Sequence, residues 1–127
     1  KAHFLYFLFQ YQFPYIGRCY AWALRDSAQK ITDMRLEERK ELFDILIPSW
    51  DKAIQRLFQY DWPNIAFLGN ETPHLHAHFI PRYQTPRIVQ GIEFIDPHPK
   101  GNYAPYPKKD IPLEILLTIK KDIGRIV

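Results

Sequence analysis

Apolar and polar positions change their period several times along the chain, and each change predicts an element. The aromatic-rich run from His3 to Gln12 and the run Arg18–Leu24 are typical of strands, with Pro14 and Gly17 marking a turn between them. From Arg35 to about Tyr60, apolar residues recur at steps of three and four. That spacing predicts an amphipathic helix.

Two residues set the expected limits of this helix. Asp33 stands where an N-cap is expected, just before the first turn. Pro48 lies inside the apolar pattern and lacks the backbone N–H that a helix interior uses. We therefore expect the helix to be kinked or split at Pro48.

The second half of the chain predicts two more strands and a final helix. The strands are Ile65–Asn70 and His74–Tyr83, and residues 83–110 form a loop-rich tail with a short strand around Ile92–Ile95. Residues 111–125 predict a C-terminal helix, with Asp110 as its cap. This order predicts one α+β domain over residues 1–127, with an antiparallel sheet of about five strands.

Composition narrows the classes of protein. The chain has 127 residues, of which 46% are hydrophobic, so a packed core is expected. The net charge of +3 suits a phosphate-bearing ligand. The sequence has neither a like-charged tail nor a long apolar run, so we expect neither a nucleic-acid partner nor a membrane partner. The lone Cys19 fits a reducing compartment, so we expect a cytoplasmic protein. Because the only methionine is Met34 and the chain starts at Lys1, we expect a longer natural product.

The main chemical signal is a row of three histidines, His74, His76 and His78, at intervals of two. On a strand these side chains share one face, and the apolar residues between them take the other face. We expect the apolar face to pack beneath a helix. The histidine face is then left for solvent, a cleft or a partner.

Three interpretations of the row remain open on the residues alone. The row is a set of surface histidines, part of a metal site, or a nucleophile with two supports. One strand places the Cα atoms of His74 and His78 roughly 13 Å apart, so a zinc ion needs ligands from elsewhere, such as Glu71, Asp96 or His98. As a nucleophilic site, the row makes His76 the attacking imidazole, flanked on both sides.

The stretch HLHAHFIPR, residues 74–82, resembles the signature of the histidine triad family, in which His-x-His-x-His precedes two apolar residues. The likeness extends over roughly Phe4 to Arg82. The phrase FLGNETPHLHAHFIPRY looks most like short bacterial members described as diadenosine polyphosphate hydrolases.

This resemblance implies a nucleotide hydrolase that cleaves a dinucleoside polyphosphate or similar nucleotide at the α-phosphate. It assigns a covalent nucleotidyl intermediate to His76, and phosphate contact or orientation to His74 and His78. It further implies a homodimer that needs no cofactor, with Mg²⁺ as a counter-ion of the substrate. A nucleotidyl transferase, a phosphoramidate hydrolase and a non-catalytic nucleotide-binding protein are the alternatives.

The chain departs from the family pattern at two places. Many members carry Gln, then Ser or Thr, shortly before the first histidine; here Asn70 and Glu71 stand there, and Thr72 follows. We expect Asn70 and Thr72 to contact substrate. Many members also have Gly-His at the second strand, where this chain has Arg18 after glycine. Arg18 favours an anionic leaving group, unless it points to solvent or pairs with Asp26.

The remaining candidates each carry an alternative. The resemblance places Gln10 and Gln12 where ribose is contacted, although glutamines at a strand end are often only solvated. Arg82 reaches phosphate or clamps the end of its strand. Residues 102–109, NYAPYPKK, fold over the site, extend a dimer contact or form a surface loop.

Overall fold

The computed structural model of the chain describes residues 1–8 and 14–124. Its strands are β1 (Phe4–Leu8), β2 (Cys19–Ala23), β3 (Trp62–Ala66), β4 (His76–Arg82), β5 (Arg87–Val89) and β6 (Ile92–Phe94). Its helices are a 3-10 turn (Ile31–Asp33), α1 (Leu36–Lys40), a π-helical segment (Glu41–Leu46), α2 (Ile47–Phe58) and α3 (Leu113–Gly124).

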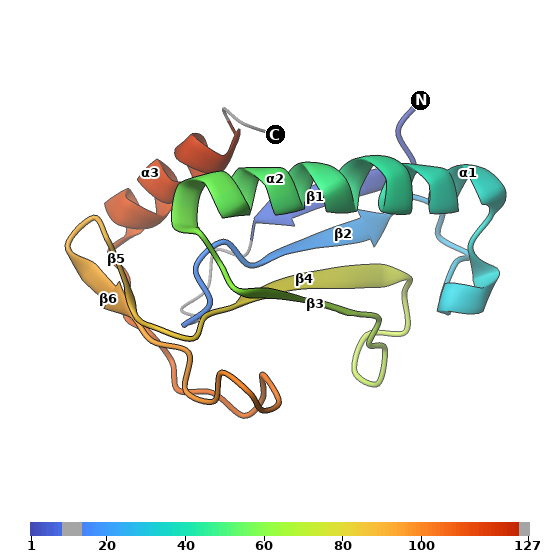
Figure 1. The fold of residues 1–127 in the computed structure, drawn as a ribbon. Coiled ribbons are helices and arrows are strands. Elements are labelled where there is room, and N and C mark those ends of the chain that lie inside the picture. The colour runs from blue at the N-terminus through green and yellow to red at the C-terminus, as the bar shows by residue number, and fades with distance from the viewer. Residues whose placement is uncertain (9–13, 125–127) are drawn as a thin grey trace.

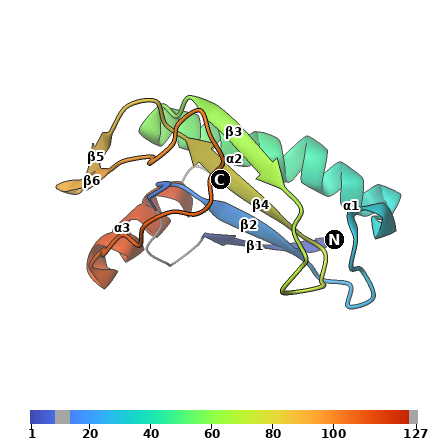
Figure 2. The same ribbon diagram turned by 90° about the horizontal axis from the view of Figure 1, so that it is seen from below.

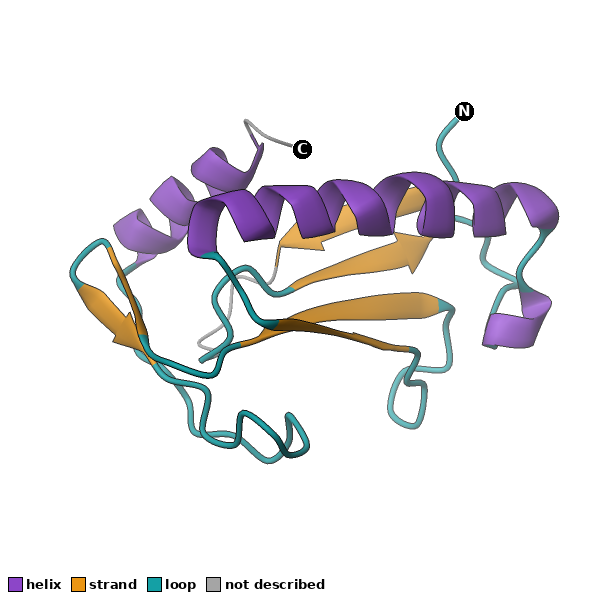
Figure 3. Cartoon of the chain, in the orientation of Figure 1, coloured by secondary structure: helices purple, strands orange, loops and turns teal. Residues whose placement is uncertain are grey.

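The predicted α+β architecture is confirmed. Strands β1 to β4 form an antiparallel sheet in the order β1-β2-β4-β3, and α1 and α2 run as one rod across one face of it (Figures 1 and 3). The main sheet has four strands rather than about five, because β5 and β6 pair with each other as a separate hairpin. No helix in the described part of the chain is long and apolar enough to cross a membrane.

The core lies between the sheet and α2. The alternation predicted for the histidine strand is confirmed, since its apolar partners and those of β2 are buried; these residues are Leu75, Ala77, Phe79, Cys19, Ala21 and Ala23. Trp50 of α2 packs its ring 5.5 Å from that of Phe79 and donates a hydrogen bond to the backbone oxygen of Gly17. The opposite face of β2 and β4 therefore points away from the helix.

Pro48 does not split the helix, since the helical segments follow one another without a break from Leu36 to Phe58, and the ribbon runs on through them as one rod (Figure 1). The π-helical segment precedes it, and the Ile47 N–H donates to the carbonyl of Leu42, five residues back. This wider turn relieves the clash that a proline ring makes with a carbonyl four residues earlier, and Pro48 falls in the first turn of α2. Within the π-helical segment Leu42 is buried, while Phe43 next to it is 45% exposed.

The expected cap at Asp33 was wrong. The helix begins after Arg35, whose N–H donates to the Glu38 carboxylate at 2.8 Å. Asp33 instead accepts from the N–H groups of Gln29 and Lys30 and closes the preceding 3-10 turn. Each of the two carboxylates therefore accepts from free N–H groups at the start of a helix: Asp33 at the 3-10 turn and Glu38 at α1.

The later strands differ from the prediction at their limits. Strand β3 starts at Trp62 rather than Ile65, and it accommodates Pro63 because an edge strand tolerates a residue without an N–H donor. Strand β6 confirms the short strand near Ile92, while its partner β5 was not predicted. Gln90 and Gly91, with φ of 52° and 77°, form the tight turn that joins them. Helix α3 confirms the C-terminal helix, but it begins at Leu113, where the carbonyl of Pro112 accepts its first hydrogen bonds, so the expected cap at Asp110 was wrong.

Candidate active site

Strands β2 and β4 lie side by side and build the face that carries the histidines. Their antiparallel register places Trp22 opposite His76 and Tyr20 opposite His78. Since Ala21 and Ala77 point into the core, these aromatic residues share the histidine face. Sequence reasoning missed Trp22; alternation along β2, combined with antiparallel pairing to β4, is the signal that identifies it.

Trp22 forms a flat support for two imidazoles. Its ring stacks on His74 with centroids 4.2 Å apart and on His76 with centroids 5.3 Å apart. His74 precedes β4, and its Nε2 lies 2.6 Å from the backbone oxygen of Ala23. A carbonyl can only accept, so Nε2 of His74 carries the proton. The stacking on Trp22 and the hydrogen bond to Ala23 together fix the His74 ring next to His76.

The tautomer of His76 follows from its own backbone contact. Nδ1 of His76 lies 2.6 Å from the backbone oxygen of His74, and this oxygen requires a donor. Nδ1 therefore holds a proton, and in this tautomer of the ring the lone pair is on Nε2. An imidazole in this tautomer is a competent nucleophile at Nε2.

His78 completes the row as a neutral ring. Its centroid lies 4.8 Å from that of His76, in an edge-to-face arrangement. Burial is the largest cause that lowers the pKa of His78, and the charges of Arg18 and the neighbouring His76 act in the same direction, so that together they bring it to about 4. Near pH 7 the ring carries no charge. It is therefore able to donate or accept a hydrogen bond without repelling Arg18.

The lowered pKa predicts a pH-dependent stability. Between pH 6.5 and 4 the unfolded chain binds a proton on His78 that the folded chain does not, so the free energy of unfolding falls as pH decreases through this window. Allowing for solvent screening of a half-buried ring, we expect a loss of about 1–2 kcal/mol. Urea unfolding at several pH values measures it.

His78→Gln removes the titrating group and is expected to flatten the stability curve between pH 6.5 and 4. His98→Gln is the matched control, because His98 is exposed and the hydrogen bonds described for it involve its backbone. An unchanged slope in His78→Gln contradicts the prediction.

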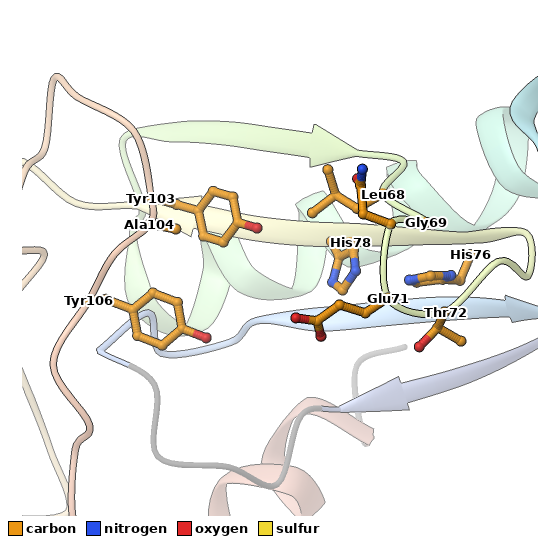
Figure 4. Close-up of a pocket in the computed structure, with 10 residues that line it drawn as sticks. Leu68, Gly69, Glu71, Thr72, His76, His78, Tyr103, Ala104 and Tyr106 are labelled. Atoms are coloured by element: carbon orange, nitrogen blue, oxygen red, sulfur yellow. The ribbon is translucent and has the colours of Figure 1, made fainter.

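A pocket of about 460 Å³ opens beside the histidines (Figure 4). The loop between β3 and β4 forms one wall, and residues from the segment between β6 and α3 form one end. The lining residues are Leu68, Gly69, Asn70, Glu71, Thr72, His76, His78, Tyr103, Ala104 and Tyr106. Volumes of this size are typical of small-molecule sites.

The pocket gathers some of the predicted site residues. His76, His78, Asn70 and Thr72 line it directly, whereas His74 lies behind His76 as a support. The exposed Glu71 lines it as well. Gln10 and Gln12 lie outside the described residues.

Arg18 is only 5% exposed, so it does not point to solvent. Its guanidinium lies 5.2 Å from the ring centre of Tyr103 and 5.7 Å from that of Tyr106. Burial lowers the pKa of Arg18, and the two tyrosines oppose that shift. An arginine stays charged even so, which places a buried positive charge beside the pocket.

Arg82 links the end of β4 to the segment that follows β6. Its guanidinium forms a buried ion pair with Asp96, at 2.7 Å, and also donates to Asn64 and to the backbone oxygens of His98 and Gly101. These five hydrogen bonds match the five N–H groups of the side chain. The geometry therefore favours the interpretation that Arg82 clamps the end of its strand over the interpretation that it contacts phosphate. Tyr103 and Tyr106 are held near the histidines by the segment that this clamp fixes.

The candidate metal ligands are not gathered into a cluster. Within residues 1–8 and 14–124, no group of three or more His, Cys, Asp or Glu side chains is placed to hold a metal ion. Asp96 instead accepts from Arg82 and from the N–H groups of Tyr83 and His98. Glu71 and His98 are both exposed.

Solved structures of three histidine triad proteins share the fold of this chain, a four-stranded antiparallel sheet covered on one face by a long helix. The structure of one such protein from Bradyrhizobium japonicum matches with a TM-score of 0.72 and 21% identity, over 100% of this chain and 86% of that chain. A histidine triad protein from Marinobacter aquaeolei VT8 matches with a TM-score of 0.68 and 22% identity, over 87% of this chain and 76% of that chain.

A third histidine triad protein, from Sinorhizobium meliloti 1021, matches with a TM-score of 0.66 and 19% identity, over 87% of this chain and 74% of that chain. No family model and no curated protein matches the sequence. At these identities the structural likeness establishes the fold. The resemblance expected from residues 74–82 is thus confirmed at that level.

Proposed function

We propose that this chain is a histidine triad enzyme that hydrolyses a dinucleoside polyphosphate, or a closely similar nucleotide, at the α-phosphate. The reaction passes through a covalent nucleotidyl intermediate on His76. The observation that carries the proposal is the bond from Nδ1 of His76 to the His74 carbonyl, which leaves the lone pair on Nε2 of a ring that lines the pocket.

The first step forms a bond from Nε2 to the α-phosphorus. At the same time the bond from that phosphorus to the bridging oxygen breaks, and its electron pair departs with the leaving nucleoside polyphosphate. In the second step water attacks the same phosphorus. The N–P bond breaks, its electron pair returns to Nε2, and the water gives up a proton to solvent as the nucleoside monophosphate forms.

Arg18 supports an anionic leaving group. An amine leaving from a phosphoramidate has to gain a proton, and a guanidinium does not act as an acid near neutral pH. A polyphosphate leaves as an anion and is stabilised by a nearby positive charge. The buried guanidinium beside the tyrosine end of the pocket therefore favours a polyphosphate substrate over a phosphoramidate.

The resemblance supplies the remaining parts of the proposal. The protein acts as a cytoplasmic homodimer on a small nucleotide rather than on nucleic acid or a membrane. It needs no cofactor, and Mg²⁺ serves as a counter-ion of the polyphosphate. Asn70 and Thr72, which line the pocket, contact the substrate.

Turnover of diadenosine tetraphosphate in ¹⁸O-labelled water tests the mechanism, with and without Mg²⁺. Attack at the α-phosphate yields AMP and ATP, with the heavy oxygen in AMP. Quenching at alkaline pH during the first turnover is expected to leave adenylate bound to the protein through an acid-labile N–P bond. Symmetrical cleavage to ADP, or label in ATP, contradicts the proposal.

A further inference from the structure

The end of the pocket away from the β3–β4 loop is aromatic. Tyr103 and Tyr106 lie with ring centroids 6.2 Å apart and planes inclined by 30°. Figure 4 shows both rings reaching from the segment between β6 and α3 toward His78. Both side chains are half-buried, so each ring retains surface that a ligand can contact. Neither residue has a place in the two chemical steps described above.

The two rings are held before any ligand arrives. The Tyr15 hydroxyl donates to the backbone oxygen of Tyr103, and the Tyr15 ring meets that of Tyr106 edge to face at 5.8 Å. Burial raises the pKa of Tyr15 to about 12, so its hydroxyl stays a neutral donor. Arg82 fixes the start of the same segment through the Gly101 carbonyl. A rigid aromatic pair loses little conformational entropy on binding.

A positive charge lies beside the same pair. The Arg18 guanidinium is 5.2 and 5.7 Å from the two ring centres, and its charge reaches the pocket, since it contributes to the lowered pKa of His78. Glu71 lines the pocket with a negative charge, but Glu71 is exposed and Arg18 is buried. Solvent and salt screen the exposed carboxylate more strongly. This end therefore combines aromatic faces with a net attraction for anions.

We propose that Tyr103 and Tyr106, with Arg18 beside them, form the subsite for the departing half of the substrate, and that this half carries an aromatic base. The inference rests on the proposed function and narrows it. Stacking on the tyrosines selects a polyphosphate with a nucleoside at both ends over one that ends in bare phosphate. Arg18 attracts the phosphates of either kind.

Two substrates with the same reacting half test this subsite. Diadenosine tetraphosphate and adenosine tetraphosphate both transfer adenylate to His76, but the first releases ATP and the second releases tripolyphosphate. We expect Tyr103→Ala and Tyr106→Ala each to lower kcat/KM for diadenosine tetraphosphate roughly tenfold or more. The loss on adenosine tetraphosphate is expected to be at least about fivefold smaller.

Four further variants define the result. Tyr103→Phe and Tyr106→Phe keep the rings and are expected to keep the ratio of the two kcat/KM values. Arg18→Met is expected to lower both values together. Trp62→Ala, a large exposed aromatic residue that does not line this pocket, serves as the control for losing surface aromatic area.

The ratio separates the possible outcomes. A variant that folds poorly loses activity on both substrates, so a changed ratio in Tyr103→Ala or Tyr106→Ala supports the subsite even then. Equal losses on both substrates, or none, overturn the subsite and leave the proposed function standing. A wild-type protein that hydrolyses neither substrate overturns both the subsite and the proposed function.

Discussion

His76→Asn is expected to lower kcat/KM for diadenosine tetraphosphate by at least about a hundredfold while the protein stays folded. The substitution removes Nε2, the atom proposed to form the bond to phosphorus, and replaces the ring with a short amide. Steady-state kinetics measure the loss, and circular dichroism checks the fold. The alkaline-quenched variant is also expected to carry no bound adenylate.

His98→Asn is the control for this experiment, because His98 lies outside the histidine pocket. Retention of more than about a tenth of the activity in His76→Asn removes the covalent route. If His76→Asn loses activity but still carries bound adenylate after the alkaline quench, another residue is the nucleophile. In either case the stacked arrangement of Trp22, His74 and His76 requires a different explanation.

Arg82→Met is expected to lower the free energy of unfolding by about 3–5 kcal/mol, because it removes one partner of a buried ion pair. Burial raises the pKa of Asp96, but hydrogen bonds from Arg82 and from the N–H groups of Tyr83 and His98 outweigh it and hold this pKa below its usual value. Without Arg82, the carboxylate keeps the cost of burial and loses its strongest partner. Urea denaturation measures the change.

Two variants separate the ion pair from general disturbance. Arg39→Met, on an exposed position of α1, is expected to change stability by less than about 0.5 kcal/mol. The double variant of Arg82→Met with Asp96→Asn is expected to recover part of the loss, since no charge is then left buried without its partner. A loss below about 1 kcal/mol in Arg82→Met contradicts the clamp.

The histidine strand illustrates what local pattern predicts well. Alternation alone divides residues 74–79 between two faces, because a strand fixes this division through its backbone. The buried Leu75 and Phe79 and the pocket-lining His76 and His78 follow that division. The fold follows too, since the order and periods of the elements are local properties of the sequence.

The role of Arg82 depends on residues distant in the sequence and was not predictable from its own surroundings. Its partners are Asn64 and Asp96, 18 and 14 positions away, and two carbonyls of an irregular segment. Tyr103 and Tyr106 pose the same difficulty, since no period governs the path of residues 97–107. The π-helical turn before Pro48 likewise depends on hydrogen bonding that the apolar pattern does not record.

The segment between β6 and α3, which carries Tyr103 and Tyr106, lies on the side of the main sheet away from α2 (Figure 1), and it passes in front of the end of that sheet when seen from below (Figure 2). It is tied at Gly101 by Arg82 and at Tyr103 by Tyr15 through backbone oxygens, which any residue supplies. Side chains at positions 103 and 106 are therefore replaceable without moving the histidines. If the proposed function and subsite hold, the choice of leaving group is thus free to diverge, by natural drift or by design, while the proposed reaction at His76 stays the same.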